Sequence, residues 1–207
     1  MNPKVYDNFK KWTNHNYGKH GEVKYNRLKV HKYLGLTFDL TGKSKVKIKM
    51  DGYVERIINE SPTKIIKSDT ALNPAVNNIY GKGNSKKLKK GTEEFHNSVA
   101  RIMFVANREK LDIHQTVVVL STRVREPNKN DWKKLVRMIK YLNGKKKKYL
   151  TLSADDLKVI KWYVEKAFAV HHDFKSHTGA IMTLGQGAMQ SVSRKQKLNT
   201  RSIAEAE

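Results

Sequence analysis

The sequence predicts an α+β fold, in which a β-hairpin is followed by three helices and then by a second group of strands. Three observations predict it. Apolar residues alternate with lysines between residues 45 and 50, apolar residues recur at helical spacing in three segments between residues 92 and 144, and short apolar runs follow from residue 149 onward. At 207 residues, the chain is long enough for one large domain or two small ones.

The first twenty residues are polar and aromatic and show little periodicity. The hairpin is expected to follow, with an apolar strand-like run over residues 30–38, a turn signal over residues 41–44 and the alternating segment 45–50. One face of the hairpin is then buried, and the other presents lysines. A short helix is expected from Asp51, as its cap, to Asn59, with three apolar residues facing inward: Val54, Ile57 and Ile58.

A long connection without regular structure is expected from Ser61 to Lys90, because proline and glycine recur along it. Connections of this length are uncommon inside a compact domain, so we expect a mobile segment. Three helices then follow, starting near Thr92, Asp112 and Asn130. Their expected core positions are Phe95, Val99, Ile102 and Ala106; Ile113, Val117, Leu120 and Val124; and Trp132, Leu135, Val136, Ile139 and Leu142.

The third helix is expected to end at Asn143-Gly144, and the lysine run over residues 145–148 marks the expected domain boundary. Beyond it, strands are expected around residues 149–152, 157–164, 178–184 and 188–193, with the start of a helix at the end of the chain.

Charge gives the strongest indication of a partner. Forty-two Lys and Arg residues against nineteen Asp and Glu residues give a net charge of +23, which favours a polyanion such as nucleic acid. A solvated basic surface without a partner is the alternative. No apolar run is long enough to span a membrane, and no cysteine is available for a disulfide or a thiolate metal site.

Basic residues concentrate on the third helix. Lys133, Arg137 and Lys140 follow helical spacing opposite the Trp132 face, so they form a stripe that can follow a phosphate backbone without reading sequence. A solubilising helix face is the competing interpretation. The expected nucleic-acid contacts in this region are Lys133, Lys134, Arg137, Lys140, Lys145 and Lys146.

Several segments resemble copia-type retrotransposon Pol polyproteins. Residues 126–144, with a proline, a tryptophan and a final Tyr-Leu-Asn-Gly, resemble the last thumb helix of the reverse transcriptase. Residues 95–112 resemble the preceding thumb helices but depart at Lys110-Leu111, where the family has Arg-Pro. Residues 31–36 resemble the hairpin that grips the primer end, which implies nucleic-acid contacts by three residues: Tyr33, Leu34 and Gly35.

The segment 161–207 has an apolar strand ending in Glu165, a strand with Thr178-Gly179, a Ser-Arg-Lys-Gln-Lys run at 193–197 and Ala-Glu-Ala-Glu at 204–207. In this order, these pieces resemble the start of the ribonuclease H domain of the same family, in which carboxylates bind Mg²⁺. The resemblance implies that Glu165 and Glu207 are the first two of these catalytic and metal-binding carboxylates. Glu165 departs from the family, which has Asp there, and Lys166 replaces a small residue. The remaining carboxylates would lie beyond residue 207, so nuclease activity is not expected.

Other candidate sites are weaker. The family's paired polymerase aspartates have no counterpart before His31. The pair Asp155-Asp156 follows the thumb-like segment in an expected turn, where it suits turn and cap positions. The spacing of His171, His172 and His177 is not a standard zinc pattern. We therefore expect no bound cofactor, although the parent family uses Mg²⁺.

The resemblance implies three segments: residues 1–60 as the end of the palm with a primer-grip-like hairpin, 61–144 as a thumb-like helical region, and 145–207 as a truncated ribonuclease H-like α/β domain. The expected function is that of an intracellular polyprotein fragment, cytoplasmic or nuclear, that contacts an RNA–DNA hybrid or another nucleic-acid duplex. The alternative is a co-opted or unrelated basic protein that binds nucleic acid structurally. Enzyme activity and oligomeric state are left open by the sequence.

Overall fold

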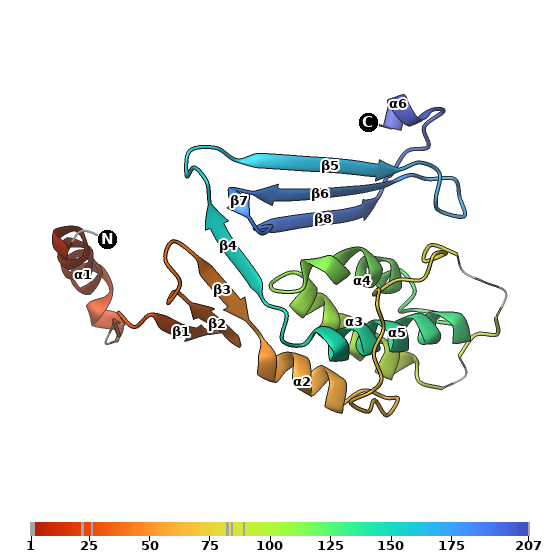
Figure 1. The fold of residues 1–207 in the computed structure, drawn as a ribbon, viewed down its shortest axis with the longest axis horizontal. Coiled ribbons are helices and arrows are strands. Elements are labelled where there is room, and N and C mark those ends of the chain that lie inside the picture. Colours follow the sequence, from red (N-terminus) through yellow and green to blue (C-terminus); the bar gives the residue numbers. More distant parts are fainter. Residues whose placement is uncertain are drawn as a thin grey trace.

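The computed structural model describes residues 3–21, 23–25, 27–81, 83, 85–88 and 90–206. The fold is α+β, as the sequence predicts. A five-stranded sheet lies beside a helical unit, and a three-stranded sheet lies above that unit (Figure 1).

The five-stranded sheet is antiparallel throughout and has the order β1-β2-β3-β4-β7. The predicted alternation is confirmed on β3, where Ile48 packs against the core and Lys47 is exposed. The strands are β1 (Val30–Tyr33), β2 (Leu36–Asp39), β3 (Val46–Lys49), β4 (Leu150–Ala154) and β7 (Gly185–Gln186).

The helical unit forms the main core. Its helices are α2 (Asp51–Asn59), α3 (Thr92–Ala106), the 3-10 helix η2 (Leu111–Ile113), α4 (His114–Ser121) and α5 (Lys129–Lys145). The apolar faces expected from helical spacing are confirmed, because Phe95, Ile102, Ile113, Leu135 and Ile139 are fully buried. Burial of such side chains stabilises the unit by about 1.5–3 kcal/mol each.

The helix α5 does not end at Asn143-Gly144 but continues to Lys145. The side chain of Asn143 is buried and donates to the backbone carbonyls of Ile66 and Asp69 in the connection 61–90. Asn143 therefore ties this connection to α5 and does not end the helix. The Lys110 ammonium donates to the backbone carbonyls of Lys145 and Lys148, which satisfies the carbonyls at the end of α5.

The described part of the connection 61–90, here called the strap, has almost no regular structure, as expected. It lies along α5 and is anchored there by side chains of that helix. An isolated bridge between Lys87 and Asn128 fixes its last part beside the start of α5. The strap is therefore docked over most of its length by hydrogen bonds to one helix.

The second sheet contains β5 (Lys161–Ala167), β6 (His177–Thr183) and β8 (Gln190–Lys195) in the order β5-β6-β8. One face of this sheet lies over α4, where Ser191 of β8 bonds to His114. The short helix α6 (Ile203–Ala206) follows near the end of the described chain.

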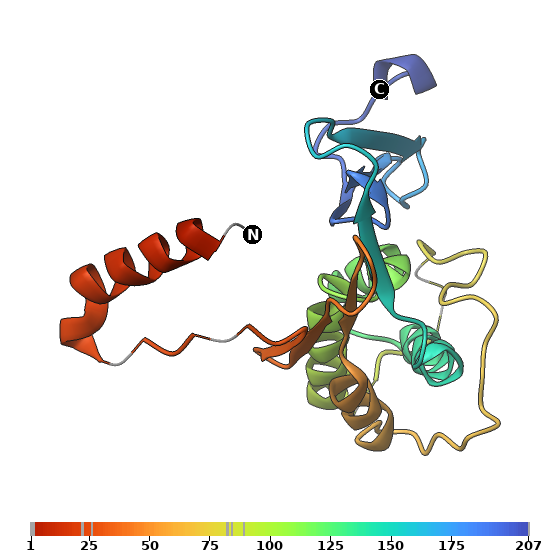
Figure 2. The same ribbon diagram turned by 60° about the vertical axis from the view of Figure 1, so that its left-hand side comes forward.

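The N-terminal segment holds an element that the sequence does not reveal: the helix α1 (Pro3–Tyr17), followed by the 3-10 helix η1 (Gly18–His20). No residue of α1 is buried, and the helix stands away from the rest of the chain (Figure 2). Its apolar side chains are spaced as on one helix face but are outnumbered by polar ones. Among the described residues, no helix is long and apolar enough to cross a membrane.

Strand pairing connects segments on both sides of the expected boundary at residues 145–148. Val46 of β3 lies opposite Leu152 of β4, so a strand from the segment 145–207 belongs to the same sheet as the hairpin from the segment 1–60. The division into palm, thumb and ribonuclease H-like segments remains a prediction.

Candidate nucleic-acid interface

The start of α5 is fixed by its own side chains. The Asn128 side chain accepts hydrogen bonds from the backbone N–H groups of Asn130 and Asp131, and the Asp131 carboxylate accepts one from the N–H of Asn128. This reciprocal capping box satisfies N–H groups that the helix leaves unpaired. The capping box thus fixes the backbone at the start of α5.

Lys133 and Lys134 are neighbours on α5 with opposite environments. Lys133 is exposed. Lys134 is 3% exposed, and its ammonium donates to the backbone carbonyls of Ile79 and Gly81 at 2.9 and 2.6 Å. Burial lowers the pKa of Lys134. Its ammonium is therefore committed to the strap, and we leave it out of the interface proposed below, although the sequence places it there.

Arg137 and Lys140 also contact the strap but remain partly exposed. The Arg137 guanidinium donates through Nε to the carbonyl of Ala75 at 3.2 Å. The Lys140 ammonium lies 2.8 Å from Oδ1 of Asp69 and holds the pKa of that carboxyl below its usual range. Both cations keep a solvent-facing side that a phosphate can approach.

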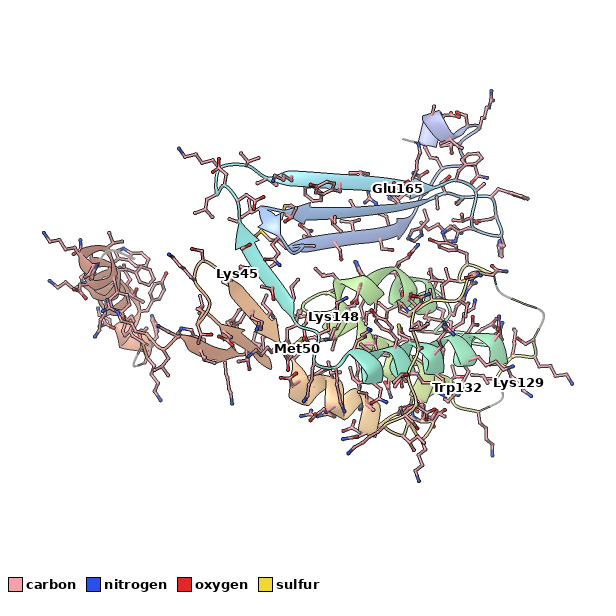
Figure 3. All side chains as sticks on the ribbon, viewed as in Figure 1. Lys45, Met50, Lys129, Trp132, Lys148 and Glu165 are labelled. Carbon is pink, nitrogen blue, oxygen red and sulfur yellow. The ribbon has the colours of Figure 1, made fainter. Side chains whose placement is uncertain are left out.

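Trp132 lies near the start of α5, beside Lys129 (Figure 3). Two grooves adjoin it, and its half-buried ring stacks on Phe95 with ring centroids 6.4 Å apart. The larger, of about 650 Å³, lies between α5 and the strap and includes Lys133, Arg137 and Lys140. The smaller, of about 280 Å³, is lined by Leu88, Lys90, Lys129, Trp132 and Lys133. Basic side chains therefore lie in both grooves beside Trp132.

Lys90 and Lys129 were not singled out from the sequence. Both are exposed and line the smaller groove. Their signal is the lysine-rich end of the strap, which the bridge between Lys87 and Asn128 brings to the start of α5. This contact joins segments far apart in the sequence, so no local periodicity indicates it.

The other predicted contacts lie elsewhere. Lys145 is exposed and Lys146 half-buried at the far end of α5. Tyr33, Leu34 and Gly35 form the tight connection between β1 and β2, with positive φ at Leu34 and Gly35. Tyr33 and Leu34 are exposed, but the β1–β2 hairpin and the start of α5 lie at opposite ends of the body (Figure 1). The structure does not gather the predicted residues into one surface.

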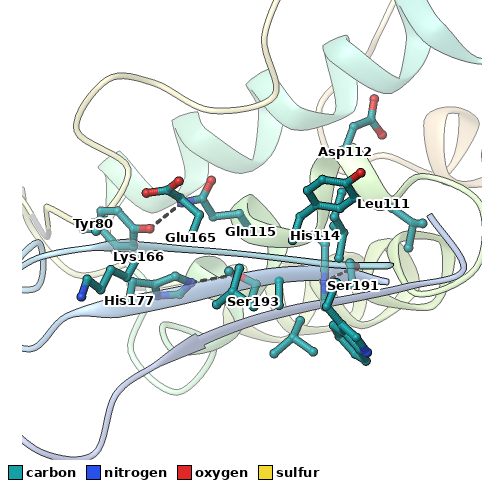
Figure 4. Close-up of a pocket in the computed structure, with 18 residues that line it drawn as sticks. Tyr80, Leu111, Asp112, His114, Gln115, Glu165, Lys166, His177, Ser191 and Ser193 are labelled. Carbon is teal, nitrogen blue, oxygen red and sulfur yellow. Dashed lines mark hydrogen bonds between the residues drawn. The ribbon is translucent and has the colours of Figure 1, made fainter. Parts of the chain in front are cut away.

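Glu165 points into a cavity of about 960 Å³ between the three-stranded sheet and α4 (Figure 4). Asp112 also lines this cavity, but its carboxylate accepts a hydrogen bond from the Tyr141 hydroxyl at 2.6 Å. Lys166 alternates to the other face of β5, and its ammonium donates to the carbonyl of Ile203.

A two-metal site does not fit the part of the chain that the structure describes. Within it, no three His, Asp or Glu side chains converge closely enough to hold a metal ion. Glu207, the second expected carboxylate, lies outside the described residues. One carboxylate at Glu165 cannot by itself fix the positions of two Mg²⁺ ions.

His177 lines the same cavity near Glu165 (Figure 4), in contacts that the sequence spacing does not indicate. His177 is 4% exposed, and its ring nitrogens lie 3.1 Å from Nε2 of His171 and 2.7 Å from Oγ of Ser193. Burial lowers the pKa of His177 to about 4. Tyr80 of the strap packs against both imidazoles with ring centroids about 5 Å away. The neutral histidines therefore join the strap to the three-stranded sheet.

Comparison with known proteins gives one similarity to a curated protein. The chain is 24% identical over 160 residues to the Saccharomyces cerevisiae protein described as transposon Ty5-1 protein YCL074W. The match covers 77% of this chain and 51% of the yeast protein, so the chain spans about half the length of this relative. No family model and no solved structure matches the chain. The similarity is to a transposon protein and is consistent with a retrotransposon-related chain.

Proposed function

We propose that this chain is a retrotransposon-derived segment of a reverse transcriptase and ribonuclease H polyprotein, and that it contacts nucleic-acid duplexes through the exposed side of α5. The observation that supports this proposal most directly is the pair of grooves on either side of Trp132. Five basic side chains line these grooves: Lys90, Lys129, Lys133, Arg137 and Lys140.

The chemistry of these side chains favours phosphate. Ammonium and guanidinium groups donate charge-assisted hydrogen bonds to phosphate oxygens. Four of them lie on α5, which is capped at its start and packed into the core through Leu135 and Ile139, so the backbone positions of these four are fixed. Contacts of this kind hold a duplex without reading its bases, because phosphates carry no direct sequence information.

The proposal includes no catalytic role for the isolated chain. Glu165 has no converging set of acidic partners within the described residues. We therefore expect neither primer extension nor cleavage of an RNA–DNA hybrid when Mg²⁺ is added. Hybrid cleavage that persists after Glu165→Gln would point to a contaminating nuclease, whereas cleavage lost in that variant would contradict this part of the proposal.

Fluorescence anisotropy with a labelled RNA–DNA hybrid tests the interface. Lys133→Gln should weaken binding several-fold, because it removes a charge that borders both grooves. Lys158→Gln is the matched control, since it removes the same charge from an exposed position before β5. Equal affinities for the two variants would refute a localised interface on α5, even if the chain binds the hybrid through its overall charge.

A further inference from the structure

The strap is held on α5 in two different ways along its length. Its later part is anchored in the interior, because Lys134, which is 3% exposed, donates to the carbonyls of Ile79 and Gly81. Its earlier part, residues 69–75, is here called the front segment and lies at the surface, where Leu72 is 88% exposed. Segments with few buried apolar contacts open at the lowest free-energy cost, so the front segment is the part of the strap that can leave α5 most easily.

Two cations of α5 hold the front segment. Arg137 donates through Nε to the carbonyl of Ala75 at 3.2 Å, and the Lys140 ammonium lies 2.8 Å from Oδ1 of Asp69. The side chain of Asn143 also donates to the Asp69 carbonyl, which fixes the beginning of the segment. The side chains of Lys140 and Asp69 are 36% and 28% exposed, and ion pairs in contact with solvent contribute little to stability. Exchange of Asp69 for another anion therefore costs little.

The Asp69 carboxylate lies where a phosphate oxygen would bind Lys140. Carboxylate and phosphate oxygens both accept charge-assisted hydrogen bonds from an ammonium group. Arg137 and Lys140 line the groove of about 650 Å³ between α5 and the strap, so a duplex in this groove brings its phosphates to these two cations. A phosphate beside Lys140 would meet the like charge of Asp69 at short range, where charges repel each other. The two anions therefore compete for this position.

We propose that the front segment competes with nucleic-acid phosphates for Arg137 and Lys140, and that a bound duplex displaces it from α5. This inference rests on the proposed function and concerns the regulation of the same interface. With the front segment in place, the grooves offer three cations to phosphate: Lys90, Lys129 and Lys133. With the segment displaced, Arg137 and Lys140 become available as well. The strap thus lowers the affinity of the interface until a duplex replaces it.

A disulfide between the strap and α5 tests the displacement. A Cβ added at Gly144 would lie 3.1 Å from Cβ of Thr70, slightly closer than the roughly 3.5–4.5 Å that is usual across a disulfide. The chain has no cysteine, so the double variant Thr70→Cys with Gly144→Cys can form only this bond within one copy. In fluorescence anisotropy with a labelled RNA–DNA hybrid, the oxidised double variant should bind about tenfold more weakly than its reduced form, because two cations stay occupied.

The single variant Gly144→Cys is the control for this experiment, and an oxidant should leave its affinity for the hybrid unchanged. Thiol titration of the double variant shows that the disulfide has formed. Equal affinities of the oxidised and the reduced double variant would overturn the proposal.

Removal of the Asp69 charge gives a second test, which does not depend on the disulfide. Asp69→Asn should strengthen hybrid binding about threefold, because Lys140 loses its partner within the chain. The matched control is Asp173→Asn, which removes the same charge from an ion pair of similar exposure, with Lys195 of β8. Equal effects of the two substitutions, or no effect of Asp69→Asn, would contradict competition by the front segment.

The proposed interface and the proposed competition fail in different ways. If Lys133→Gln and Lys158→Gln bind the hybrid equally well, α5 is not the interface. If Lys133→Gln binds more weakly than Lys158→Gln, while the oxidised and reduced forms of the double variant bind equally, α5 contacts the hybrid with the strap in place and only the competition is wrong.

Discussion

Replacement of Lys134 by methionine should separate the stability of the helical unit from nucleic-acid binding. The Lys134 ammonium is almost fully buried and holds the strap through two carbonyls, at 2.9 and 2.6 Å. Hydrogen bonds to charged groups contribute about 1.5–3 kcal/mol each, and the methionine side chain regains part of the loss by burying apolar surface. We therefore expect Lys134→Met to lower the free energy of unfolding by about 2–3 kcal/mol.

Urea denaturation followed by tryptophan fluorescence measures this change, and limited proteolysis reports whether the strap leaves α5. The matched control is Lys133→Met, one residue away, exposed and on the groove side. It should leave stability nearly unchanged and weaken hybrid binding, whereas Lys134→Met should do the reverse. Equal urea midpoints for the two variants would refute the assigned role of Lys134.

Three further changes test the core and its buried titratable groups. Trp132→Ala should lower the free energy of unfolding by about 2–3 kcal/mol, as measured by thermal or urea denaturation. This is less than for a fully buried tryptophan, because the ring is half-buried against Phe95. An unchanged midpoint would show that the ring does not support the core. Burial lowers the pKa of His177 from 6.5 to about 4, so its contribution to stability is lost as pH falls from 6.5 to 4. His177→Gln should therefore flatten this part of the curve of stability against pH. An unchanged slope would show that His177 is not the titrating group. Burial raises the pKa of Glu109 from 4.5 to about 7, so this group destabilises the fold as pH rises through that range. Glu109→Gln should raise the free energy of unfolding by about 1–3 kcal/mol above pH 7 and by little near pH 5. A gain independent of pH would show that ionisation of Glu109 is not its cause.

Local periodicity was sufficient to predict the core. The apolar positions of α2, α3 and α5 follow directly from helical spacing, because a helix with one apolar stripe has to bury that stripe. The alternation on β3 works in the same way for a sheet with one buried face. These elements could be predicted because each residue's environment depends on neighbours a few positions away.

Features that depend on long-range contacts could not be predicted. The pairing of β4 with β3 joins residues about a hundred positions apart, and no pattern in either segment specifies the partner. The contact of His177 with His171, Ser193 and Tyr80 likewise depends on how the strap and the sheet meet. The helix α1 was missed for a different reason, since polar residues outnumber apolar ones in its sequence.

The basic stripe of α5 shows why candidate binding residues are harder to predict than core residues. Helical spacing places lysines on the polar side of the helix. It does not show which of them, such as Lys134, donate to carbonyls of the strap and are therefore turned away from solvent. Salt dependence can count how many cations remain available. If Lys90, Lys129 and Lys133 alone meet phosphates, the logarithm of the binding constant should fall with a slope of about −2.7 against the logarithm of salt concentration. If Arg137 and Lys140 leave the strap to bind, the slope approaches about −4.5, and removal of the Asp69 partner of Lys140 by Asp69→Asn should then strengthen binding. A slope near zero would exclude phosphate contacts by this helix altogether.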